Sequence, residues 1–177
     1  MSAAARGELV LRLGTPDDDE SFWRCLDAVA RERRFLAMVE APPLEQARAF
    51  LAEARERGMV QFLALEGTRV VGWCDIGPKP LEGFRHVGTL GMGLLPDQRG
   101  RGLGARLLAL AVSGACERGL ARVELEVYGS NDAALLLYRR AGFVSEGRKR
   151  AARILDGRVD DIECMALALP PEARARS

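Results

Sequence analysis

The chain has 177 residues, of which 48% are hydrophobic and 29% are charged, so it is long enough for one globular domain with a substantial core. Its 26 basic residues almost balance its 25 acidic residues, which excludes a general electrostatic attraction to nucleic acid or to anionic membranes and makes any anion site local. Four scattered cysteines without a Cys-x-x-Cys pair, a single histidine, no secretory signal and no run of 18 apolar residues predict reduced thiols, no metal and a soluble cytoplasmic protein.

The first half of the chain predicts one strand, two helices and a strand pair. In chain order these are a strand over 9–13, helices over 15–34 and 44–57, and strands over 59–66 and 69–76. Thr15 suits a helix N-cap, Pro16 suits the first helical position, and the acids that follow oppose the helix dipole. Pro42-Pro43 separates the two helices, and Gly67-Thr68 joins the two strands.

The second half alternates strands and helices. The predicted elements are a strand over 87–95, a helix over 102–118, a strand over 122–128, a helix over 132–141, and strands over 143–153 and 159–169. The order predicts an α/β mixture, with a largely antiparallel front half and one strand–helix–strand crossover over 87–128. We expect a single domain over 1–177, with a core of about 9–169 and a flexible tail over 170–177.

A glycine-rich turn, Pro96-Asp97-Gln98-Arg99-Gly100-Arg101-Gly102-Leu103-Gly104-Ala105, joins a strand to a helix. Glycine lets a backbone approach a ligand closely, and the first N–H groups of a helix are unpaired. With the helix dipole and the charges of Arg99, Arg101 and Arg106, these donors predict a site for a diphosphate. The alternative is a turn that only uses glycine for its conformation, with arginines facing water.

The same turn also fits the dinucleotide fingerprint G-x-G-x-x-A, with Glu124 or Glu126 near the position of the ribose contact. Three features disfavour that interpretation. Residues 96–98 separate the strand from the glycines, the preceding elements are not βαβ, and too little chain follows Tyr128 for a second nucleotide-binding half. A Walker-type loop is excluded because no Gly-Lys-Ser/Thr follows.

Two motifs resemble one known family. Arg99–Gly104 is similar to the pyrophosphate motif Q/R-x-x-G-x-G/A of the Gcn5-related N-acetyltransferase (GNAT) superfamily, and Asn131–Phe143 is similar to its second signature, N-x-x-A-x-x-L-Y-x-x-x-G-F. The motifs have the family order, and the resemblance covers about Leu9 to Leu169. It implies the GNAT fold, a mixed, mostly antiparallel sheet of about seven strands with about four helices. It also implies transfer of an acetyl group from acetyl-CoA to a primary amine.

The end of the chain carries a narrower resemblance. Glu146-Gly147-Arg148, Asp156–Asp160 and Met165 are similar to the bacterial amino-acid and phosphinothricin-type acetyltransferases. This subgroup implies a small-molecule acceptor such as an amino acid or an analogue. Other readings are a protein N-terminal or lysine acetyltransferase and a non-catalytic acyl-CoA-binding domain. The family likeness also suggests a homodimer, and neither nucleic acid nor membrane is an expected partner.

The family resemblance implies a role for each motif. Residues 99–104 would hold the pyrophosphate of CoA, the strand at Met92–Leu94 would pair with the pantetheine arm, and the Leu94 N–H would face the thioester oxygen. Asn131 would contact the arm, and Tyr138 would protonate the leaving thiolate. The residues implied in cofactor binding are Met92, Leu94, Arg99, Gly100, Arg101, Gly102, Leu103, Gly104, Ala105, Asn131, Ala134 and Tyr138.

The chemistry of these side chains is compatible with the implied roles. A phenol with a pKa of about 10 can hand a proton to a thiolate whose thiol has a pKa of about 8.5. Asn131 also suits a helix N-cap, and Tyr138 also suits a core aromatic position.

The general base is not evident. Some family members carry a glutamate early on the fourth strand, where this chain has about Gly88, and no carboxylate occurs from 86 to 95. An amine acceptor must lose a proton before it attacks. The candidates are a water chain, Glu40, Glu124 and His86, the last of which also fits a histidine at a loop edge.

The segment 35–43 between the first two helices would line the acceptor site in this family. Phe35, Met38 and Glu40 are candidate contacts, although the apolar members also suit helix packing. Arg85 could grip the carboxylate of an amino acid with two hydrogen bonds, beside His86, and Glu40 could face its amine. The alternative is that these charged side chains only face water.

Overall fold

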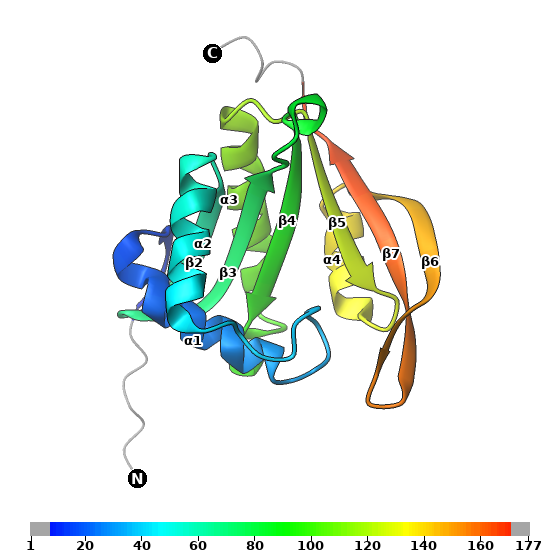
Figure 1. The fold of residues 1–177 in the computed structure, drawn as a ribbon, viewed down its shortest axis with the longest axis horizontal. Helices are drawn as coiled ribbons and strands as arrows, with labels where there is room; N and C mark the ends of the chain where they lie inside the picture. The colour runs from blue at the N-terminus through cyan, green and yellow to red at the C-terminus, as the bar shows by residue number, and fades with distance from the viewer. Residues whose placement is uncertain (1–7, 171–177) are drawn as a thin grey trace.

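The computed structural model describes residues 8–170, which form one seven-stranded sheet with four helices (Figure 1). In chain order the elements are β1 (Leu9–Leu13), α1 (Asp19–Ala30), α2 (Leu44–Glu56), β2 (Val60–Glu66), β3 (Arg69–Pro78), β4 (Val87–Leu94), α3 (Leu103–Glu117), β5 (Arg122–Tyr128), α4 (Asp132–Arg140), β6 (Val144–Leu155) and β7 (Arg158–Ala168). Short 3₁₀ turns cover Pro16–Asp18, Glu82–Phe84 and Pro96–Gln98.

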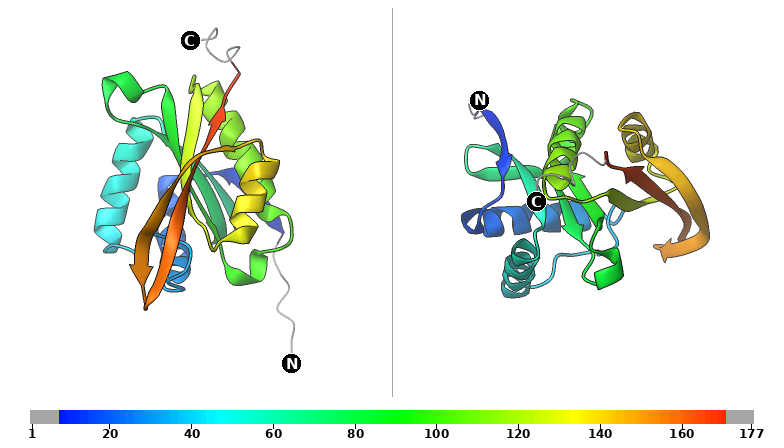
Figure 2. Two further views of the ribbon diagram at one scale, coloured as in Figure 1. Left: turned by 90° about the vertical axis from the view of Figure 1, so that its right-hand side faces the viewer. Right: turned by 90° about the horizontal axis from the view of Figure 1, so that it is seen from above.

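The sheet has the strand order β1-β2-β3-β4-β5-β7-β6. All neighbouring strands are antiparallel except β4 and β5, which are parallel and are joined by the α3 crossover. Helices α1 and α2 cover one face of the sheet, and α3 and α4 cover the other (Figure 2). The predicted α/β class and GNAT-type fold are therefore confirmed. Among residues 8–170, no helix is both long and apolar enough to cross a membrane.

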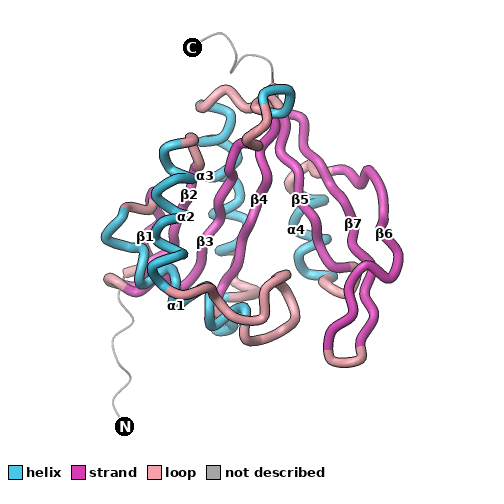
Figure 3. Tube along the Cα trace, in the orientation of Figure 1, coloured by secondary structure: helices cyan, strands magenta, loops and turns pink. Residues whose placement is uncertain are grey.

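Strands β4 and β5 form a fork. They pair only where Val87–Thr89 faces Arg122–Glu124, and beyond that point they separate (Figure 3). The Leu95 N–H donates to the Val71 carbonyl at 2.9 Å. Because hydrogen-bonded and non-hydrogen-bonded pairs alternate along antiparallel strands, the N–H groups of alternate β4 residues, 90, 92 and 94, point away from β3. These main-chain groups therefore face the open fork.

Helix α3 packs an apolar stripe onto the sheet. Its fully buried residues include Leu107, Leu108, Ala111 and Ala115, which recur at the helical spacing of three to four. Burying each such leucine contributes about 1.5–3 kcal/mol. The stripe fixes the start of α3 beside the end of β4, which is where the fork opens.

Helix α1 is shorter than its sequence predicts. It ends at Ala30 instead of about Arg34, so the predicted C-terminal boundary is wrong. Arg33 takes a left-handed conformation with a φ of 57°, and its guanidinium pairs with Asp156 of the β6–β7 turn at 2.7 Å. Glu32 pairs with Arg99. These long-range pairs hold the last predicted turn away from the helix axis. Local sequence patterns cannot predict such contacts, because the paired residues are far apart in the chain.

Gly93 illustrates how closely β4 packs. A Cβ atom at this position would lie 2.3 Å from the Trp73 ring, which itself packs edge-on against Phe22 of α1 at a centroid distance of 5.5 Å. We expect Gly93→Ala to lower the free energy of unfolding by about 1–3 kcal/mol, the usual cost of overpacking. Urea denaturation measures it. Gly147→Ala is the control, because a Cβ there meets no atom within 4 Å. Equal stability of the two variants would contradict this packing.

Candidate active site

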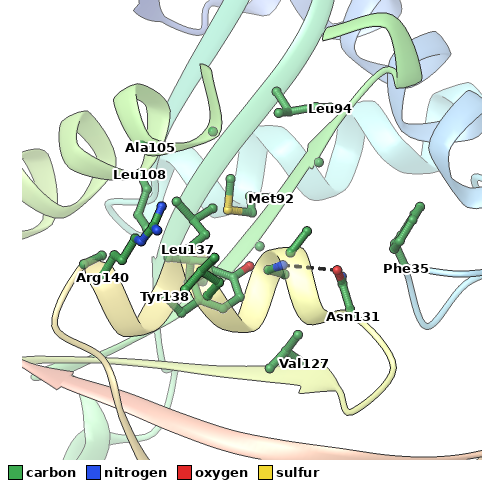
Figure 4. Close-up of a pocket in the computed structure, with 18 of the residues that line it drawn as sticks. Phe35, Met92, Leu94, Ala105, Leu108, Val127, Asn131, Leu137, Tyr138 and Arg140 are labelled. Carbon is green, nitrogen blue, oxygen red and sulfur yellow. Dashed lines mark hydrogen bonds between the residues drawn. The ribbon is translucent and has the colours of Figure 1, made fainter. Parts of the chain in front are cut away.

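A cavity of about 1260 Å³ runs through the fork between β4 and β5 (Figure 4). Its walls come from β4, the length of α3 as far as Cys116, the end of β5, α4 and the segment that follows α1. The predicted cofactor residues that line it are Met92, Leu94, Arg99, Gly100, Gly102, Gly104, Ala105, Asn131, Ala134 and Tyr138. The other two do not line it: Leu103 is buried in the core, and Arg101 is exposed.

The start of α3 forms the anion-binding end of this cavity. Gly100 and Gly102 have positive φ angles of 70° and 77°, a conformation that favours glycine. The first helical hydrogen bond runs from the Arg106 N–H to the Gly102 carbonyl, so the N–H groups of residues 103–105 have no backbone partner within 8–170. Three free donors at a positive dipole end fit a diphosphate.

The three arginines near this turn differ in role. Arg99 donates to the Leu94 carbonyl at 2.7 Å and to Glu32 at 2.8 Å, so its guanidinium ties the end of β4 to the segment after α1. Arg101 and Arg106 are exposed, and neither forms an ion pair with any residue that the structure describes. The local positive charge predicted for the turn therefore rests on Arg101 and Arg106.

The edge of β4 supplies main-chain donors along the cavity. Since Arg99 occupies the Leu94 carbonyl, the Leu94 N–H is the group of that residue that remains open toward the fork. The Met92 N–H has the same orientation, by the alternation described above. An extended ligand that carries amides can add to such an edge as a further strand would. The arrangement suits the pantetheine arm of CoA.

Tyr138 of α4 is buried against Phe143, with its hydroxyl on the side of Met92 (Figure 4). The hydroxyl has no hydrogen-bond partner among the described residues, and burial raises the pKa of the phenol well above its ordinary value. The group therefore stays protonated at neutral pH. Burial in the same cavity also raises the pKa of a thiol, so the phenol keeps its capacity to protonate a thiolate that forms beside it.

Asn131 acts as the N-cap of α4. Its Oδ1 accepts a hydrogen bond from the Ala134 N–H at 3.2 Å (Figure 4), as the capping alternative predicts. The side-chain amide nitrogen is not used in this bond. Because Asn131 also lines the cavity, the capping role leaves a hydrogen-bond donor for a ligand.

The segment after α1 lines the side of the cavity that faces α1 and α2. Phe35 lies under the Arg99 guanidinium at 4.7 Å, and Tyr128 lies under that of Arg153 at 4.4 Å. Arg153 also donates to the Arg33 carbonyl at 3.0 Å. With the Arg33–Asp156 ion pair, this contact joins the segment after α1 to the β6–β7 hairpin, and we call these two contacts the clasp.

The predicted acceptor residues lie elsewhere. Arg85 and His86 are exposed just before β4, and His86 lies six positions before Met92, about 20 Å along a strand. Glu40 is exposed and lies 3.5 Å from Arg31. None of the three lines the cavity. Glu124, the other candidate base, is held by Lys79 and Arg122, and these hydrogen bonds lower the pKa of its carboxyl. A carboxyl with a lowered pKa is a weaker base.

Sequence reasoning missed Asp75. This residue lies on β3, directly opposite Gly91, a cavity residue. Burial raises the pKa of the Asp75 carboxyl to about 7. The available signal was the segment Val70-Val71-Gly72-Trp73-Cys74-Asp75-Ile76, where a single carboxylate interrupts an apolar strand.

Comparison with known proteins gives a consistent picture. Residues 21–143 match the family model described as "Acetyltransferase (GNAT) family". The chain is 32% identical over 127 residues to the L-methionine sulfoximine/L-methionine sulfone acetyltransferase of Pseudomonas paraeruginosa, covering 71% of this chain and 74% of that protein.

Solved structures share the fold. An acetyltransferase of the GNAT family from Streptococcus pneumoniae superposes with a TM-score of 0.85 at 26% identity, covering 92% of this chain and 100% of the other. A phosphinothricin acetyltransferase from Sinorhizobium meliloti, solved in complex with acetyl-CoA, gives 0.85 at 20% identity, covering 91% and 88%. The superfamily and the subgroup predicted from the motifs agree with these matches.

Proposed function

The chain belongs to the acetyltransferase (GNAT) family and is an acetyl-CoA-dependent N-acetyltransferase, and from that premise we propose that its acceptor is the primary amine of an amino acid or an amino-acid analogue. The observation that carries the proposal is the cavity that passes through the fork and is lined on its α1 side by Phe35. A thioester held from the α3 side would meet an acceptor that enters from the α1 side.

Different residues along this cavity would have different roles in binding and catalysis. The N–H groups at the start of α3, with Arg101 and Arg106, would hold the diphosphate of acetyl-CoA, and the β4 edge would hold its arm. Acetyl-CoA supplies the activated acetyl group. The Leu94 N–H would donate to the thioester oxygen, and Tyr138 would donate its proton to the departing sulfur.

The acceptor side suits a small molecule with a carboxylate. Arg153 stacks on Tyr128, a cavity residue, and its guanidinium can hold a carboxylate at that rim. Phe35 offers an apolar contact for a side chain. The relative from Pseudomonas paraeruginosa, named for two methionine derivatives, supports the same class of acceptor.

An acceptor panel tests the proposal. Thiol release from acetyl-CoA is measured with L-methionine sulfone, L-methionine sulfoximine, common L-amino acids, polyamines, aminoglycosides and short peptides with free N-termini. We expect the highest kcat/KM for a free amino acid or an analogue. Amines that keep the side chain but lack the α-carboxylate should lose at least tenfold, because a lost charged hydrogen bond costs about 1.5–3 kcal/mol.

Two controls accompany the panel. Acetyl-CoA hydrolysis without acceptor sets the background, and mass spectrometry of the product locates the acetyl group on nitrogen. A kcat/KM for peptides well above that of every small amine would overturn the acceptor class and leave the acetyltransferase activity in place. It would also favour a protein N-terminus as the acceptor.

A further inference from the structure

We propose that Asp75 of β3 is the general base that takes a proton from the acceptor ammonium on the α1 side of the fork. The inference rests on the proposed function, because it requires an amine acceptor at that side of the cavity. It goes beyond the sequence-based candidates Glu40, Glu124 and His86. Asp75, like those three, is not itself a lining residue, but Gly91, which lies directly opposite it on β4, lines the cavity.

The direction of the Asp75 side chain follows from the pleat of β3. Trp73 meets Phe22 of α1, whereas a Cβ at Gly72 would meet Leu107 of α3. Because side chains alternate between the faces of a strand, Asp75 shares the α1 face with Trp73. Phe35, on the segment after α1, lines the cavity on this same side of the sheet, where the acceptor would enter.

The distance to the cavity is short. A Cβ atom placed on Gly91 would lie 3.1 Å from Asp75 Oδ1, so the carboxylate lies over the main chain of β4 at that residue. Gly91 lines the cavity, one residue before Met92. The glycine leaves open the space that any other side chain would fill between the carboxylate and the fork. An amine that approaches a thioester held beside Met92 therefore passes within reach of Asp75.

No charged partner occupies the Asp75 carboxylate. Its side chain forms no hydrogen bond or ion pair with any residue in 8–170, and burial alone raises its pKa to about 7. Its neighbours on this face of the sheet include Gln61 of β2, Thr89 of β4 and Trp73 of β3 itself, all uncharged. A base with this pKa is half ionised near neutral pH, whereas an ordinary aspartate is too weak a base to take a proton from an ammonium group.

The other titratable groups near this face include Glu126 of β5, a carboxylate that lines the cavity and pairs with Lys149. The buried side of α1 carries Phe22, Cys25 and Val29, and burial raises the pKa of Cys25 to about 12, so the thiol is neutral. Further along β3, Lys79 pairs with Glu124 and not with Asp75. Gln61, the direct cross-strand neighbour of Asp75, is buried and its amide has no partner within the described residues.

The transfer then balances as follows. Asp75 takes one proton from the ammonium nitrogen, and the freed lone pair forms the N–C bond to the acetyl carbon. The C–S bond breaks as its electron pair passes to sulfur, and Tyr138 donates a proton to that sulfur. The nitrogen loses its second proton, which restores Tyr138 through solvent. Asp75 returns its proton to water, so one proton is released for each acetyl group transferred.

The test compares Asp75→Asn with wild type over pH 5.5–10, using acetyl-CoA and L-methionine sulfone or whichever panel amine gives a higher kcat/KM. For wild type, log kcat/KM should rise through pH of about 7, where Asp75 ionises. For Asp75→Asn that limb should disappear, and log kcat/KM should instead rise only as the pH approaches the pKa of the free amine. At pH 7 the variant should be at least tenfold slower. Calorimetry should show unchanged acetyl-CoA affinity.

A second readout does not depend on turnover. An acid whose pKa rises on folding binds more protons in the native state, so its contribution to stability is complete below its unfolded pKa of about 3.9 and is lost as pH rises toward 7. Wild type should therefore lose thermal stability over this range more steeply than Asp75→Asn. Glu53→Gln, which removes one exposed carboxylate of α2, is the charge-matched control and should keep both wild-type profiles.

The outcomes separate the two proposals. An active Asp75→Asn variant that keeps the wild-type limb near pH 7 overturns Asp75 as the base, and so does loss of that limb in Glu124→Gln alone. A wild-type protein that acetylates no amine overturns the proposed function together with this step. Should Asp75→Asn fail to fold, Asp75→Ser and Asp75→Glu give the same comparison, and only the glutamate is expected to keep a limb near neutral pH.

Discussion

Tyr138→Phe is expected to lower kcat about 100-fold while the protein stays folded and binds acetyl-CoA as before. Tyr138 is buried in the wall of the cavity with a hydroxyl that has no other described partner. Its raised pKa keeps the proton in place until a thiolate forms beside it. Loss of a general acid costs on the order of 10²-fold or more, about 2.7 kcal/mol in the barrier. Single-turnover kinetics make the chemical step the one observed.

The second tyrosine of the chain supplies a matched comparison. Tyr128 also lines the cavity, but its ring stacks under Arg153 on the acceptor side. Tyr128→Phe keeps that ring and should lower the single-turnover rate constant far less than Tyr138→Phe. If the two variants were equally active, or if Tyr138→Phe kept the wild-type rate, Tyr138 would be a packing residue only.

Gly102→Val is expected to weaken acetyl-CoA binding at least tenfold, about 1.4 kcal/mol. Gly102 is the N-cap of α3 with a φ of 77°, which a β-branched residue avoids. A Cβ at Gly102 meets no protein atom within 4 Å, so it would point into open space beside the anion site. Valine would therefore both turn the first N–H groups of α3 and occupy space near the diphosphate. Isothermal calorimetry measures the affinity.

Gly58→Val is the control for this substitution. Gly58 also has a positive φ, 91°, and its only described neighbour within 4 Å of a Cβ is the end of the Arg118 side chain. It follows α2 and does not line the cavity. Both variants should lose similar stability, but only Gly102→Val should lose affinity. Unchanged affinity in Gly102→Val would contradict the placement of the diphosphate at the α3 start.

Much of the fold could be predicted because its signals are local. Alternation of apolar residues marks 122–128 as a strand, and the predicted range matches β5. Proline, glycine and capping residues place the starts of α2 and α4. The end of α1 could not be predicted in this way. Its last expected turn is held by Arg33–Asp156 and Glu32–Arg99, whose partners lie 123 and 67 residues apart in the sequence.

The same distinction between local and long-range signals applies to the candidate site. The turn over 99–104 and the helix that carries Tyr138 are contiguous motifs, and the structure brings both to one cavity. Asp75 belongs to no such motif. Its place beside the fork depends on the register of β3 against β4, and its basicity depends on burial by distant segments. Neither property can be read from the residues adjacent to it.

The donors along the β4 edge have a genetic consequence. Binding of a ligand through main-chain N–H groups does not depend on which side chains those residues carry. Most point mutations at 90, 92 and 94 would change only side chains that face α3 and would leave those donors in position. Proline is the exception, because it removes the N–H itself. Over evolutionary time this strand can therefore exchange these side chains while it keeps its main-chain contacts with one common acyl carrier.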